Sequence, residues 1–312
     1  MSRLSYAECS ARERLAALLD AGSFHEWLPP AQRVASPHLA ALGVPSAFDD
    51  GVAIGRARLG GRPVFVAAQE GAFMGGGVGE VHGAKLVGLL RRAQAAQTAQ
   101  TAQGSSQGEC PEAVLLLLES GGVRLHEANA GLIAVSEVMR ALLDLRAAGL
   151  PVVVLIGGGA GCFGGMGIVA SCADRVVMSD VGRHAMSGPE VIEASHGVEE
   201  FDSRDRARVW RTTGGRHRYL CGDCDLLVED DVAAFRAAAL LAIGQGPRPL
   251  TLAALQAQQA VLEARSRLAQ GADDAAALWR RLGVTEAEAV PDLALERLRA
   301  LRPLHLADDT GA

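Results

Sequence analysis

Apolar runs that end in glycine-rich turns recur along the first half of the chain. The runs are Val64–Ala68, Ala113–Leu118 and Pro151–Ile156, and each leads into clustered glycines and then into residues with helical spacing. A short apolar run bounded by glycine is typical of a buried strand, and the spacing that follows is typical of a helix. The pattern therefore predicts three successive strand–turn–helix units, with Arg175–Met178 starting a further strand.

The alternation of strands with helices of this length predicts parallel pairing and right-handed crossovers. Ligands bind at the carboxyl ends of the strands in such sheets. The turns expected there contain Phe73–Gly79, Glu119–Arg124 and Gly157–Gly167. A glycine turn before a helix leaves backbone N–H groups without partners at the positive end of the helix dipole. We therefore expect a site that binds an anion or a developing oxyanion through the backbone.

The pattern divides the chain into three parts. Ser10–Leu19 is typical of a capped helix, and we assign residues 1–35 to an N-terminal helical segment. The strand–helix units occupy residues 36–243, interrupted by the polar, low-complexity run Ala93–Cys110, which extends a helix and then frays into a loop. Residues 244–312 have a wholly helical pattern, and we expect this extension to pack on the sheet domain or on a partner.

Composition narrows the class of protein. Hydrophobic residues make up 49% of the 312 residues, which is ample for a core. The net charge of −6 and the aromatic content of 4% argue against nucleic-acid binding. No apolar run approaches the roughly 18 residues that a membrane helix needs, and the N-terminus lacks the apolar core of a signal peptide. We therefore expect a cytoplasmic protein that does not bind a membrane.

Lysine and cysteine usage raises two further candidates. Lys85 is the only lysine among 30 basic residues. Compositional bias explains that count, yet its place on the first helix after a glycine turn leaves a phosphate or carboxylate role open. Cys221 and Cys224 form a CxxC without the second pair that a zinc site needs, so we expect free thiols and no metal. The turn around Cys162 has Ala160 where a nucleophile elbow has its first glycine, which favours a small core thiol.

Several motifs resemble the carboxyltransferase branch of the crotonase superfamily and follow one another in the order found there. The resemblance runs from about Leu18 to Asp231. The motifs are Phe73–Gly76, Ser120–Arg124 with Glu127, and Ser187–Glu193. Longer stretches resemble the β subunits of malonate decarboxylases: Gly79–Lys85, Gly121–Asn129, Gly161–Gly167 and Glu199–Arg206. The resemblance implies an α/β, crotonase-like (ClpP/crotonase) fold of repeated β-β-α units, followed by the helical C-terminal tail.

Acetyl-CoA carboxylase β subunits are the nearest alternative family. This chain lacks their N-terminal four-cysteine zinc ribbon. Its first turn reads Gly-Gly-Gly-Val-Gly-Glu where that family typically has Gly-Gly-Ser-Met-Gly-Ser, and its second begins Glu119-Ser120 where that family has small residues. These departures favour a decarboxylase. A β subunit of an acyl-CoA carboxylase carboxyltransferase, and a non-catalytic subunit that docks a carrier, remain the alternatives.

The resemblance implies decarboxylation of a malonyl thioester to the acetyl thioester and CO2. The electron pair released with CO2 flows into the thioester carbonyl, and backbone donors stabilise the enolate oxygen. By resemblance to crotonase oxyanion holes, one donor comes from Gly121–Gly122 and the other from Gly164–Gly165. We expect the Gly122 and Gly164 N–H groups to face one pocket. The expected substrate-binding residues are Gly76, Gly77, Lys85, Arg124, Ser187, Gly188 and Pro189. The candidates for protonating the enolate or orienting the carboxylate are His82, His126, Glu119 and Glu127, each more simply read as a helix-end or solvent contact.

The same resemblance implies partners. A homologous γ subunit would share the active site, and an acyl carrier protein subunit would carry malonate on a phosphoribosyl-dephospho-CoA arm supplied by a separate transferase subunit. CoA is the alternative carrier, and no cofactor is expected to be attached covalently to this chain. The chain has no biotin-type Met-Lys-Met sequence, so biotin, if used, sits elsewhere.

Overall fold

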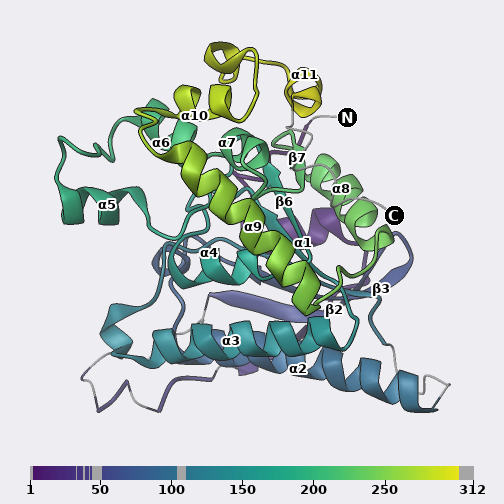
Figure 1. Ribbon diagram of the computed structural model, residues 1–312. Coiled ribbons are helices and arrows are strands. Elements are labelled where there is room, and N and C mark those ends of the chain that lie inside the picture. Colours follow the sequence, from purple (N-terminus) through teal and green to yellow (C-terminus); the bar gives the residue numbers. More distant parts are fainter. Residues whose placement is uncertain are drawn as a thin grey trace.

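A mixed seven-stranded sheet lies at the centre of the computed structural model (Figure 1), which describes residues 3–32, 34–37, 39–41, 43, 51–103 and 110–301. The strands follow chain order: β1 (His25–Trp27), β2 (Val52–Leu59), β3 (Arg62–Gln69), β4 (Ala113–Leu117), β5 (Val152–Ile156), β6 (Arg175–Ser179) and β7 (Leu226–Val228). Strands β1 to β3 pair antiparallel, and β3 to β7 pair in parallel. The predicted parallel core is therefore confirmed, extended by an antiparallel edge.

Helices connect the parallel strands and cover both faces of the sheet. They are α1 (Ala11–Leu18), α2 (Glu80–Gln103), α3 (Ala130–Ala147), α4 (Gly164–Ser171), α5 (Pro189–His196), α6 (Arg206–Thr213), α7 (Gly215–Leu220), α8 (Val232–Gly244), α9 (Leu252–Ala269), α10 (Ala275–Arg281) and α11 (Leu295–Ala300). Short 3-10 turns lie at Pro30–Gln32, Met74–Gly76, Leu125–Glu127 and Ala287–Ala289. Helices α2 and α3 run side by side, whereas α5 projects from the body (Figure 1).

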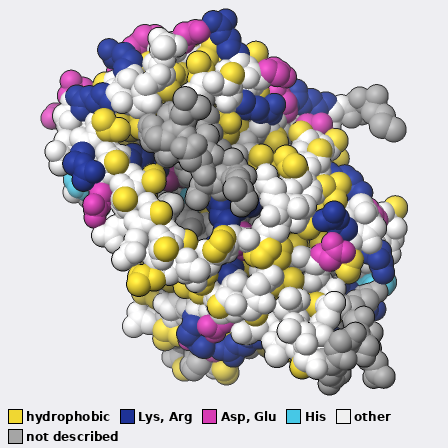
Figure 2. Space-filling view, turned by 45° about the vertical axis from the view of Figure 1, so that its right-hand side comes forward, with side chains coloured by type: hydrophobic (Ala, Val, Ile, Leu, Met, Phe, Trp, Pro, Cys, Tyr) yellow, Lys and Arg dark blue, Asp and Glu magenta, His cyan; other side chains and the backbone are white. Residues whose placement is uncertain are grey.

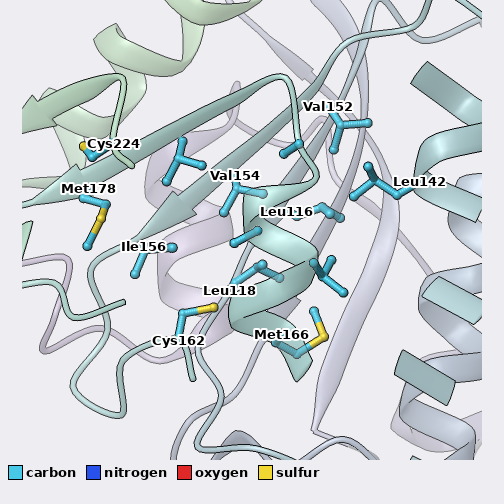
Figure 3. Packing of buried hydrophobic residues seen from close by; sticks show 14 of the residues in the cluster. Leu116, Leu118, Leu142, Val152, Val154, Ile156, Cys162, Met166, Met178 and Cys224 are labelled. Atoms are coloured by element: carbon cyan, nitrogen blue, oxygen red, sulfur yellow. The ribbon is translucent and has the colours of Figure 1, made fainter. Parts of the chain in front are cut away.

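The strands β4 and β5 are buried on both faces because their side chains alternate between two cores. Leu116 and Val154 join a core with helices α2, α3 and α4, and Figure 3 shows both side chains within it. Leu115 and Val153 instead join a core with α1 and α8. Burial on both faces explains why these strands read as continuous apolar runs.

A second, minimal layer of pairing lies above the carboxyl ends of the parallel strands. It consists of isolated parallel bridges: Val78 with Val123, Ser120 with Cys162, and Cys162 with His184. Each bridge links residues that follow successive strands of the main sheet. The second strand of each β-β-α unit is thus reduced to a bridge between turns, and the crotonase-like α/β fold expected from the sequence is confirmed.

The two ends of the described chain differ in how they pack. Helix α1 packs with α8 against one face of the sheet, and its capping box at Ser10 confirms the helix start predicted from the sequence. Trp279 of α10 is 1% exposed within the larger core, whereas α9 buries no residue completely. The segment boundaries at residues 35 and 243 stay predictions.

The charges on the surface are mixed. On the face shown in Figure 2, acidic and basic side chains are interspersed and hydrophobic side chains lie between them. Within the described ranges, no helix combines the length and apolarity needed to cross a membrane. A cytoplasmic location stays a prediction.

Candidate functional site

The three glycine turns predicted at the strand ends lie beside one another. Five backbone hydrogen bonds among the described residues join them: Gly121 N–H to Gly75 O (2.8 Å), Val78 N–H to Gly122 O (2.9 Å), Arg124 N–H to Val78 O (3.0 Å), Ser120 N–H to Gly161 O (2.8 Å) and Phe163 N–H to Ser120 O (2.8 Å). The first turn thus contacts the second, and the second contacts the third. The site is held together by main-chain contacts, so its geometry follows the register of the sheet beneath it.

Glycine is required where the turns touch. Gly164 opens α4 with a φ of +61°, and a Cβ added there would lie 3.1 Å from Gly122 Cα. Gly76 has a φ of +68°, and its Cβ would strike the backbone of Glu119. Positive φ and close approach both exclude larger residues at these two positions. The predicted catalytic turns therefore come into direct contact through Gly122 and Gly164.

The hydrogen-bond partners of the four candidate donors differ from the expectation. Gly121 N–H donates to Gly75 O, and Gly164 N–H donates to Met186 O at 2.8 Å. Within the described ranges, the Gly122 N–H donates to the Ser120 hydroxyl alone, at 3.2 Å. Gly165 N–H has no protein acceptor among the described residues. The expectation that Gly122 and Gly164 both present open N–H groups is therefore corrected, because the Gly164 amide is already used. Gly165 keeps its N–H open among the residues described, and the catalytic role of the four glycines stays a prediction.

The segment Ser187–Pro189 lies against the start of α4. Residues before it pair with the third turn: Cys162 N–H donates to Arg183 O (2.8 Å), Ala185 N–H to Cys162 O (3.2 Å) and Gly164 N–H to Met186 O (2.8 Å). Gly188 then caps α5, which begins with Pro189 at its first turn. The structure therefore brings Ser187, Gly188 and Pro189 next to the donor turns, and their binding role stays a prediction.

Arg124 joins the first two turns from inside the protein. Its Nε donates to Gly77 O at 2.8 Å, and its Nη1 donates to Glu127 at 3.2 Å. The guanidinium also stacks over the ring of Phe73, and the residue is 5% exposed. Arg124 thus fixes the Gly76–Gly77 turn, and direct contact with substrate stays a prediction for all three residues.

Lys85 is also buried. The residue is 6% exposed, and its Nζ donates to Val52 O at 2.6 Å and to Leu28 O at 3.3 Å. These bonds anchor α2 to the start of β2 and to the segment that follows β1. The geometry gives Lys85 a structural role, and its predicted role in thioester binding remains untested.

The other ionisable candidates have structural partners. His82 is fully buried with its Nε2 2.9 Å from Gln69 Nε2, and Glu127 accepts the Glu80 N–H at 2.8 Å. Glu119 is buried in an ion pair with Arg14. His126 alone among the four has a partly exposed side chain, at 34%. Sequence reasoning missed Arg14 and Gln69, because no motif marks either residue.

Cys162 and Cys224 lie in the larger apolar core. Cys162 is fully buried, and Figure 3 shows its sulfur within the packed cluster near Met166. Burial raises the pKa of its thiol, which opposes a nucleophilic role. Burial also raises the pKa of Cys221 to about 12. In the part of the chain that the structure describes, no three His, Cys, Asp or Glu side chains group as metal ligands.

Exposed apolar side chains project from the segments that form and flank the turns. This apolar rim consists of Met74, Leu125, Leu132, Ile133, Met186 and Val191, which are 49–84% exposed. Met74 belongs to the first turn, Leu125 follows the second, and Met186 precedes the segment at the start of α4. A concentration of exposed apolar side chains next to a candidate site is typical of an interaction surface.

Comparison with known proteins places the chain in a family. Residues 6–264 match the carboxyl transferase domain. The malonyl-S-ACP:biotin-protein carboxyltransferase of Malonomonas rubra is 46% identical over 236 residues, which span 74% of this chain and 73% of that protein. The propionyl-CoA carboxylase beta chain of Saccharopolyspora erythraea is 31% identical over 229 residues, spanning 72% of this chain and 37% of that protein.

Solved structures give the same assignment. A chain of the Pseudomonas malonate decarboxylase hetero-tetramer in complex with malonate superposes with a TM-score of 0.76 at 40% identity, covering 90% of this chain and 98% of that chain. A chain of the Pseudomonas malonate decarboxylase hetero-dimer superposes with a TM-score of 0.64 at 37% identity, covering 84% and 96%. The glycine turns, the crotonase-like sheet and these similarities agree, and the chain belongs to the carboxyl transferase domain family.

Proposed function

We propose that this chain is the β-type subunit of a malonate decarboxylase. Together with a homologous γ subunit, it converts a malonyl thioester on an acyl carrier protein into the acetyl thioester and CO2. The observation that carries the proposal is the contact between the Gly122 and Gly164 turns, which leaves the Gly165 N–H without an acceptor among the described residues. Similarity to malonate decarboxylase chains over most of the sequence supports it.

The chemistry follows from the fate of one electron pair. The bond between the carboxylate carbon and the α-carbon breaks, CO2 leaves, and the electron pair forms the enolate of the thioester. The Gly165 N–H, and the Gly122 N–H after it turns from the Ser120 hydroxyl, donate to the enolate oxygen. A donor of this kind, once aimed at the oxygen, contributes about 100- to 1,000-fold to the rate. A proton from solvent or from a side chain at the site then adds to the α-carbon and completes the acetyl group.

The proposed carrier is the phosphoribosyl-dephospho-CoA arm of an acyl carrier protein, loaded by a separate transferase subunit. The apolar rim provides the surface for the γ subunit, because such a concentration of exposed apolar side chains favours burial in an interface. The two similar Pseudomonas structures are a hetero-tetramer and a hetero-dimer of malonate decarboxylase, which supports a subunit partner for this chain.

A second candidate function is transfer of the malonyl carboxyl group to a biotin protein. The 46% identity to the Malonomonas rubra carboxyltransferase favours it. Both reactions form the same enolate, so the donor turns serve either one. The two differ in the fate of CO2, which is either released or attached to biotin.

The deciding experiment uses the chain co-purified with its homologous γ subunit. CO2 release from malonyl-CoA and from the malonyl carrier is measured with and without a biotinylated acceptor protein. Release without the acceptor supports the decarboxylase. Turnover that requires the acceptor supports the transferase, and no turnover of either substrate rejects both functions. A variant of the donor turns that keeps full activity in the same complex would indicate a scaffold subunit.

A further inference from the structure

The Glu119 side chain lies where the carboxyl ends of three strands meet. Glu119 follows β4, and the side chain is 7% exposed. A Cβ added at Gly71, beyond β3, or at Gly158, beyond β5, would collide with the Glu119 carboxylate. The two neighbouring turns therefore need glycine at these positions to make room for the Glu119 carboxylate.

Both carboxylate oxygens and the backbone N–H of Glu119 have partners. One carboxylate oxygen, Oε1, accepts the Ala160 N–H at 2.9 Å. The other, Oε2, pairs with Nη1 of Arg14, whose side chain is 3% exposed. The Glu119 N–H donates to Gln69 Oε1 at 2.9 Å. One residue thus ties the ends of β3, β4 and β5 to helix α1.

Arg14 is itself held in place. Its Nε donates to Tyr6 O at 2.8 Å, and its guanidinium lies 4.6 Å from the centroid of the Tyr6 ring. Tyr6 in turn stacks on Phe235 of α8, with ring centroids 4.0 Å apart. The ion pair is therefore anchored to the helical layer behind the sheet, on the face opposite α2 and α3.

Stability alone does not account for this arrangement. Burying two charges costs as much as their attraction returns, and apolar residues of similar size often stabilise a protein equally well. The ion pair instead gives the carboxylate a fixed direction. The carboxylate holds Ala160, the adjacent Gly161 O accepts the Ser120 N–H at 2.8 Å, and the chain then enters α4 with its free Gly165 donor.

We propose that Arg14 and Glu119 are positioning residues for the oxyanion site. The pair fixes the Gly158–Gly161 turn through the Ala160 N–H, and this sets the Gly165 donor of α4 against Gly122. Neither residue touches the substrate. The inference rests on the proposed function for its kinetic test, and it has a second readout that does not depend on activity.

The test compares two neutral replacements of the pair in the complex with the γ subunit. The variant R14M/E119Q keeps an oxygen acceptor for the Ala160 N–H, whereas R14M/E119L does not. Neither leaves a buried charge unpaired. We expect R14M/E119L to lose about 100-fold in kcat, the effect of displacing a reacting group by about 1 Å, with KM within about threefold. We expect R14M/E119Q to stay within about tenfold of the wild type.

Amide exchange in the peptide spanning residues 157–165 gives the second readout. We expect faster exchange in R14M/E119L than in R14M/E119Q, because only the former loses the acceptor of Ala160. Equal exchange in the two variants, or equal kcat at equal stability, would overturn the proposal. If the wild-type complex itself releases no CO2, the proposed function fails, and the exchange comparison still decides the positioning role.

Two controls separate positioning from other roles. Arg236→Gln breaks the ion pair between Arg236 and Asp20, which ties the end of α1 to α8 away from the turns. This variant should lower the melting temperature and leave kcat unchanged. If Glu119 were instead the proton donor to the enolate, R14M/E119Q would lose activity and one limb of the pH profile. An unaltered profile is the expected result.

Discussion

Replacing Gly164 by alanine should separate the two turns that carry the proposed donors. Gly164 has a φ of +61°, a region that costs an ordinary residue about 1–2 kcal/mol. The new Cβ would lie 3.1 Å from Gly122 Cα. Because the neighbouring atom belongs to the backbone, relief requires α4 and the β4 turn to move apart. The Gly164 N–H bond to Met186 O is not removed by the change itself.

The magnitude follows from the two donors. Gly122 and Gly165 must both point at one enolate oxygen, and losing one donor costs about 100- to 1,000-fold, or about 2.7–4 kcal/mol of transition-state stabilisation. We expect Gly164→Ala to lower kcat by about 100-fold. KM should stay within about threefold, because contacts to the rest of the thioester do not depend on this oxygen. The free energy of unfolding should fall by about 1–2 kcal/mol.

The assay is CO2 release from malonyl-CoA by the complex with the γ subunit, together with thermal unfolding. Gly159→Ala is the matched control, because Gly159 lies in the same turn, has no positive φ, and has no atom within 4 Å of an added Cβ. It should retain kcat within about twofold. A Gly164→Ala complex with wild-type kcat, or an equal loss in both variants, would refute the reasoning.

Four further outcomes are expected. Trp279→Ala should lower the free energy of unfolding by about 3–5 kcal/mol in urea titration, since this 1%-exposed ring fills the core beneath α10; a change below about 1 kcal/mol would contradict that packing. Burial lowers the pKa of His217 to about 3. Between pH 6.5 and that value only the unfolded chain binds a proton at this residue, so the free energy of unfolding falls by up to about 1.4 kcal/mol for each unit by which the pH is lowered. Urea titrations from pH 7 to pH 4 should therefore show a shallower decline for His217→Gln, and identical slopes would argue against a buried neutral ring. Lys85→Met should lower the melting temperature without changing KM, whereas a raised KM at unchanged stability would restore the predicted substrate contact. The chain purified without its partner should self-associate in sedimentation velocity and release no CO2, and an active monomer would overturn the shared-site model.

Strands buried on both faces could be predicted from the sequence, whereas the sheet edge could not. The strands β4 and β5 read as apolar runs because every side chain belongs to one of the two cores. Strand β2 has Gly55, Arg56 and Arg58 within it, and its outer half alternates between buried and exposed residues. Strand β1 spans three partly exposed residues, too short a signal to separate from a turn. Edge strands depend on pairing partners that local pattern does not specify.

The candidate site could likewise be predicted only in part from the sequence. The sequence predicted that the glycine turns meet, since they follow neighbouring parallel strands. It did not predict which amide is free, because that depends on Met186 O, whose position is set by a later segment of the chain. The pair Arg14 and Glu119 is separated by 105 positions. Contacts of this kind are set by the tertiary fold and leave no local mark.

The turns are joined by main-chain bridges, whereas the apolar rim beside them consists of exposed side chains. The bridges themselves join main-chain atoms, so the pairing of the turns does not depend on the side chains at the molecular surface. The exposed side chains of the apolar rim take no part in these main-chain bridges. Substitutions in the rim can therefore change what this surface binds without disturbing the paired turns beside it.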